Sequence, residues 1–110
     1  MRRVDPATLL EQPLMLRKIG DDDYAVAVAG LALGRIMKSS RGHGRVMWFW
    51  TLTGPYVPLS MYPTSGDVAS LDQAKTAIKA AFDLWLRWAK GQGEVVWHTP
   101  QEKIEGLRPL

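Results

Sequence analysis

The chain has 110 residues, 14 of them basic and 11 acidic, which gives a formal net charge of +3, and it contains no cysteine. This length supports one hydrophobic core, so we expect a single domain over residues 1–110. The lack of cysteine excludes a disulfide framework and a thiolate metal site, and the apolar uncharged stretch of residues 24–34 is too short to cross a bilayer. We therefore expect a cytoplasmic protein without a signal peptide and with no membrane partner.

Residues 1–13 are expected to form an N-terminal arm. Asp5 is a good helix N-cap, and Pro6 suits the first helical position, whereas Pro13 blocks continuation. The pattern predicts a short helix over residues 6–12.

The next segment, residues 14–66, has the pattern of an antiparallel sheet. Apolar and β-branched residues fill 14–19, 24–29, 31–38 and 45–52, and these runs are separated by the aspartates of 21–23, by Gly30 and by a glycine-rich loop. We predict a meander of three or four strands, with the aspartates serving as a turn.

The run 45–52 is the most informative of these strands. Strand alternation directs Val46, Trp48, Trp50 and Leu52 to one face and Met47, Phe49 and Thr51 to the other, so both faces are apolar. One helix covers only one face of a sheet. We expect the second face to be covered by the chain ends, by a second copy or by a partner.

A long amphipathic helix is predicted over residues 71–90. Ser70 and Gln73 form a capping box, Phe82 and Trp85 belong to an apolar stripe at helical spacing, and Gly91 ends the pattern. In the tail, 92–110, residues 94–98 have extended character and Pro100 predicts a short helix to residue 104. The predicted fold class is α+β, with this long C-terminal helix packed on one face of the sheet.

The charges are unevenly placed, because no acid occurs between Tyr24 and Gly66. A one-sign surface attracts nucleic acid or an acidic protein, although a solvated hairpin explains the same charges. The first functional hypothesis is a nucleic-acid-binding module, with Phe49 or Trp50 stacking on bases beside the cations. The residues expected to bind nucleic acid are Arg35, Lys38, Arg41, His43 and Arg45.

The second hypothesis is a protein-interaction or homodimerisation module that uses Met47 and Phe49 on the second face of the sheet. Neither His43 nor His98 lies in a catalytic motif, and no carboxylate pair is placed for acid–base chemistry. We therefore predict no enzymatic activity, no catalytic residues, no metal and no cofactor.

Three motifs carry a resemblance: Gly34-Arg35-Ile36-Met37-Lys38, then Met47-Trp48-Phe49-Trp50-Thr51-Leu52, then Pro63-Thr64-Ser65-Gly66, followed by the alanine-rich helix that Ser70 opens. With these motifs, residues 24–88 resemble a family of small bacterial proteins that has no assigned activity. More loosely, a meander followed by a helix resembles the DNA-binding domains of phage-type integrases and plant AP2 factors. That likeness implies a sheet presented to the major groove.

Overall fold

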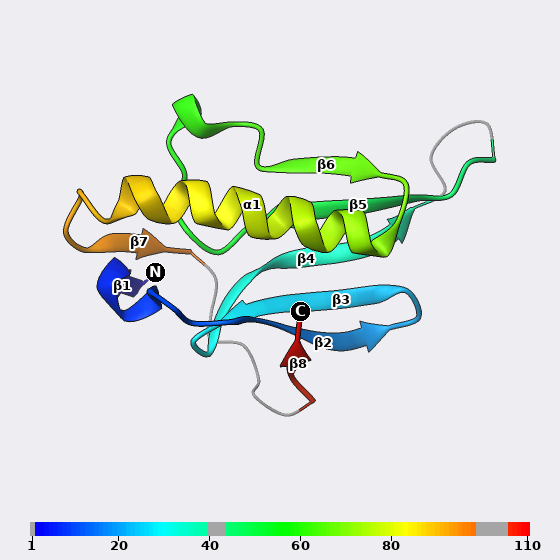
Figure 1. Cartoon of the computed structure of the whole chain (residues 1–110), viewed down its shortest axis with the longest axis horizontal. Helices are drawn as coiled ribbons and strands as arrows, with labels where there is room; N and C mark the ends of the chain where they lie inside the picture. The colour runs from blue at the N-terminus through cyan, green and yellow to red at the C-terminus, as the bar shows by residue number, and fades with distance from the viewer. Residues whose placement is uncertain (1, 40–43, 99–105) are drawn as a thin grey trace.

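The computed structural model describes residues 2–39, 44–98 and 106–110 and has two layers, a sheet and one long helix (Figure 1). The helix α1 (Leu71–Ala89) crosses one face of the sheet. Two short 3-10 helices, η1 (Pro6–Leu9) and η2 (Leu59–Met61), lie in the connections. No helix in the described parts of the chain has the length and apolar character that a transmembrane span requires.

The main sheet has six antiparallel strands in the order β6-β5-β4-β3-β2-β8. Its central meander is confirmed, because each strand from β2 to β6 pairs with the next one in the chain. The strands are β2 (Leu14–Gly20), β3 (Asp23–Val28), β4 (Leu31–Ser39), β5 (Met47–Leu52), β6 (Ser65–Val68) and β8 (Arg108–Pro109).

A second, two-stranded sheet joins the chain ends near the C-terminal half of α1 (Figure 1). It pairs β1 (Arg2–Val4) with β7 (Val95–Trp97). The extended character predicted for residues 94–98 is thereby confirmed.

The prediction of three or four strands was wrong in number, and the helix is not the last element of the fold. Strand β6 was missed because it reads Ser-Gly-Asp-Val, which lacks the apolar alternation of a strand, and β8 has only two residues, one of them Pro109. The connection between β5 and β6 contains η2. The short helix predicted up to residue 104 lies outside the described residues.

Local signals explain the elements that were predicted. Asp5 caps η1 by accepting a hydrogen bond from the Ala7 amide at 3.0 Å, as its N-cap position implies. The turn between β3 and β4 has positive φ at Ala29 (49°) and Gly30 (77°), which is typical of a two-residue hairpin turn.

The capping box of α1 is also present. The Ser70 hydroxyl accepts from the Gln73 amide at 3.1 Å, while the Gln73 side chain accepts from the Ala69 amide at 2.9 Å. These bonds satisfy amides that would otherwise lack partners at the start of the helix.

The core lies between α1 and the sheet. From the helix it takes Ala74, Ile78, Phe82, Trp85 and Ala89, and from β5 it takes Trp50 and Leu52. Trp85 and Trp97 meet edge to face with ring centroids 5.7 Å apart, a favourable aromatic geometry. Their indole nitrogens donate to backbone carbonyls, Trp85 to Tyr56 at 2.8 Å and Trp97 to Ala32 at 2.7 Å.

Residues of η1, β1 and β7, near the two ends of the chain, pack on the same side of the sheet as α1. Val4, Leu9, Val95 and Trp97 are all buried in the core that contains Trp85. Of the three covers expected for the second face, these chain-end segments are therefore not the one, because their apolar residues complete the helix-side core.

Candidate functional site

We define the open face as the side of the six-stranded sheet opposite α1. The register places residues that alternate with the core positions on this face, since successive side chains of a strand point to opposite sides. Its members on the central and β6-side strands are Asp23 and Ala25 of β3, Arg35, Met37 and Ser39 of β4, Met47, Phe49 and Thr51 of β5, and Ser65 and Asp67 of β6.

The middle of the open face is apolar. Met37 lies directly opposite Phe49 across the β4–β5 ladder. Met47 is two residues before Phe49 on β5, so both side chains point to the same face. All three side chains are half-buried. None of them belongs to the hydrophobic core or packs against it. The predicted interface residues Met47 and Phe49 thus lie together, and Met37 joins them.

Arg35 lies beside this apolar group and binds Asp23 of the neighbouring strand. The Arg35 Nε donates to Asp23 Oδ1 at 2.9 Å, and Nη2 donates to Oδ2, so the pair is bidentate. The hydrogen bond from Arg35 lowers the pKa of the Asp23 carboxyl below its usual value, and the same contact raises the pKa of Arg35. The charge of Arg35 is therefore balanced on the face itself.

Lys38 lies on the other side of the sheet, because its place in β4 alternates with those of Arg35 and Met37. Its ammonium is 3.6 Å from Asp22 Oδ2, and its amide donates to the Asp22 carbonyl at 2.8 Å. The structure thus separates two of the cations that were expected to form one surface.

The aspartates of the β2–β3 turn explain why the acid-free window is not simply cationic. Asp23 pairs in register with Met37, which brings the turn beside β4 although it precedes the window in sequence. Asp22 has a positive φ of 53°, a backbone conformation that aspartate tolerates better than most residues. Asp22 and Asp23 therefore have two roles: they belong to the turn predicted at 21–23, and they pair with Lys38 and Arg35 of β4. The spacing of these residues in the sequence did not show the pairing.

Two of the other proposed nucleic-acid contacts, Arg41 and His43, lie outside the described residues. Arg45 is exposed and precedes β5, which begins at Met47 rather than at residue 45. Of the cations predicted to bind nucleic acid, Arg35 is therefore the one that lies on the open face among the described residues of the sheet.

In the described segments, no three His, Cys, Asp or Glu side chains gather where they could hold a metal ion. His98 is exposed and contacts the edge of Tyr56, with ring centroids 6.3 Å apart.

Comparison with known proteins gives no match to a family model, to a curated protein or to a solved structure. The resemblance to a small bacterial family and the looser likeness to integrase and AP2 domains stay predictions. The candidate function accordingly depends on the geometry of the open face.

Proposed function

We propose that this protein is an interaction module that forms a homodimer through the open face. The observation that carries the proposal is the half-buried apolar group Met37, Met47 and Phe49 on the β4–β5 part of the sheet face that α1 does not cover. Apolar groups of this kind, rimmed by polar residues, mark interaction sites.

The charge of the face favours a protein partner over a phosphate backbone. The bidentate bond between Arg35 and Asp23 leaves no net charge on the pair. Charged residues at the rim, with apolar residues at the centre, are the usual anatomy of a protein interface.

A second copy is the occupant that the size of the face favours. The six strands contain 34 residues, and each residue occupies about 3.3 Å by 4.8 Å of the sheet, which gives the face a projected area of about 540 Å². The smallest stable interfaces bury about 600 Å² per partner. Two such faces can pack about 10 Å apart, as in sheet sandwiches.

Sedimentation velocity tests the dimer. We expect the wild-type chain to sediment as a dimer and Phe49→Glu to sediment as a monomer with an unchanged circular dichroism spectrum, because a carboxylate would be buried without a partner. The matched control is Leu59→Glu, since Leu59 is the most exposed large apolar residue described, at 83%, and lies in η2 away from the open face. A monomeric wild-type chain, or equal effects of both variants, would contradict the proposal.

A second candidate is nucleic-acid binding on the same face. It is favoured by the diagonal arrangement of Phe49 and Arg35 on adjacent strands, since an aromatic ring beside a guanidinium resembles the platforms that stack bases. Fluorescence anisotropy with labelled single-stranded DNA, duplex DNA and RNA at low salt tests it. Under this function Phe49→Ala weakens binding, whereas Leu59→Ala leaves it unchanged.

A further inference from the structure

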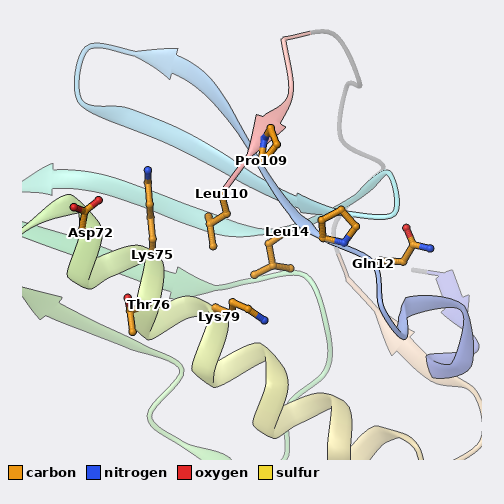
Figure 2. Close-up of a pocket in the computed structure, with 9 residues that line it drawn as sticks. Gln12, Leu14, Asp72, Lys75, Thr76, Lys79, Pro109 and Leu110 are labelled. Atoms are coloured by element: carbon orange, nitrogen blue, oxygen red, sulfur yellow. The ribbon is translucent and has the colours of Figure 1, made fainter.

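A groove runs between α1 and the β2–β8 edge of the sheet, on the side opposite the open face (Figure 2). Its volume is about 510 Å³, which lies within the range of about 300–1,000 Å³ that small-molecule sites occupy. Because it lies on the helix side, a ligand here would leave the open face accessible.

The floor of the groove is apolar. It includes Pro13, Leu14, Pro109 and Leu110. Leu14 is only 6% exposed, and Leu110 packs against the core. The Leu110 amide donates to the Leu14 carbonyl at 3.0 Å, and Pro109 pairs in register with Met15. Backbone hydrogen bonds therefore hold the floor in place.

One wall of the groove, formed by α1, has two lysines, the carboxylate Asp72 and the hydroxyl of Thr76. Lys75 and Lys79 are one helical turn apart on the flank of α1 that faces β2, and Figure 2 shows both side chains beside the floor. Lys79 already pairs with Asp83, at 3.2 Å. For Lys75 no ion pair is found among the described residues, so its ammonium is available to an anion.

We propose that this groove binds a free medium-chain alkyl carboxylate. The hydrocarbon chain lies on Leu14 and Leu110, and the carboxylate accepts hydrogen bonds from the Lys75 ammonium. An apolar floor with an adjacent cation selects a ligand that has both a hydrocarbon body and a negative head. A hydrocarbon alone would contact only the floor, and a small anion alone would contact only the lysine.

The test uses decanoate as the probe, below its micelle concentration, in a titration followed by the backbone amide NMR signals of the full chain. We expect decanoate to shift the Leu14, Lys75 and Leu110 amides at saturable concentrations. Lys75→Gln, which keeps helix propensity, should weaken the affinity about tenfold, the loss expected for one charge-assisted hydrogen bond. Lys90→Gln, beyond the far end of the same helix, is the matched control and should change it less than twofold.

Two further probes separate the chain from the head. Decanol and decyltrimethylammonium have the same hydrocarbon chain without a negative charge, and we expect both to bind at least tenfold more weakly than decanoate. Equal binding of decanol and decanoate would overturn the role of Lys75, and no saturable shifts with decanoate would overturn the site. The wild-type sedimentation coefficient, which reports on the open face, does not depend on either result.

Discussion

Arg35 and Asp23 bind each other through two hydrogen bonds across neighbouring strands, on the face of the sheet that α1 leaves open. The pair lies beside Met37 and Phe49, which form the apolar centre of that face. One contact therefore balances the charge of the predicted nucleic-acid-binding arginine and links β3 to β4 at the candidate interface.

This pair predicts a pH dependence of stability. Because the folded-state pKa of Asp23 is depressed, its contribution is present above the unfolded pKa of about 3.9 and is lost as the pH falls through the folded value. Both side chains are partly exposed, so we expect Asp23→Asn to cost less than about 1 kcal/mol at pH 7. Urea unfolding at pH 7 and at about pH 2 should show the difference between wild type and variant shrinking at low pH. Asp21→Asn, in the adjacent turn, is the control and should have little effect at either pH.

The second prediction concerns the helix side of the core. Trp85 is 1% exposed, packs on Trp97 and donates to the Tyr56 carbonyl, so Trp85→Ala should lower the free energy of unfolding by about 3–5 kcal/mol. Arg87→Ala, on the exposed side of the same helix, should change it by less than about 0.5 kcal/mol. Denaturant unfolding curves measure both, and similar midpoints would show that packing at Trp85 does not stabilise the fold.

Much of this fold follows from local patterns. The capping box at Ser70, the aromatic stripe of the helix and the alternation of Trp48, Trp50 and Leu52 against Met47, Phe49 and Thr51 all reflect interactions between residues close in sequence. These signals are readable because the periods of 3.6 and 2 residues belong to the chain itself.

Other features depend on pairing between distant segments. A register shift in the β3–β4 ladder lets Leu33 and Ile36 both reach the helix side, although strict alternation would put them on opposite faces. The contact of Asp23 with Arg35 likewise depends on register. Alternation along the strand therefore placed Met47 and Phe49 on one face, but the sequence did not show that Asp23 balances the charge of Arg35 there.

The third prediction tests a close backbone approach. A Cβ atom on Gly54 would lie 2.6 Å from Trp97 Nε1 and would overlap the Ala32 carbonyl oxygen, which are the two partners of the Trp97 hydrogen bond. Gly54→Ala should therefore cost at least about 2 kcal/mol and change the fluorescence of the buried tryptophan. At Gly91 the nearest atom would be 3.7 Å away, so Gly91→Ala should be tolerated. Equal melting temperatures for the two variants would mean that β7 is not docked through Trp97 as described.

The last prediction separates the two candidate functions of the open face. The acid-free window has four cations, but Lys38 lies on the other side of the sheet, so on duplex DNA the slope of log affinity against log salt should not exceed about 3 in magnitude. Because Arg35 is held by Asp23, Asp23→Asn should release it to a phosphate, strengthen binding at low salt and steepen that slope by about 1. Glu94→Gln removes one negative charge from an exposed residue outside the sheet, so it controls for net charge alone and should leave the slope unchanged. Anisotropy titrations at several salt concentrations provide the measurement. If neither the wild type nor Asp23→Asn binds DNA or RNA at low salt, nucleic acid is eliminated as the partner. The homodimer is then tested by comparing the sedimentation of the wild type with that of Phe49→Glu.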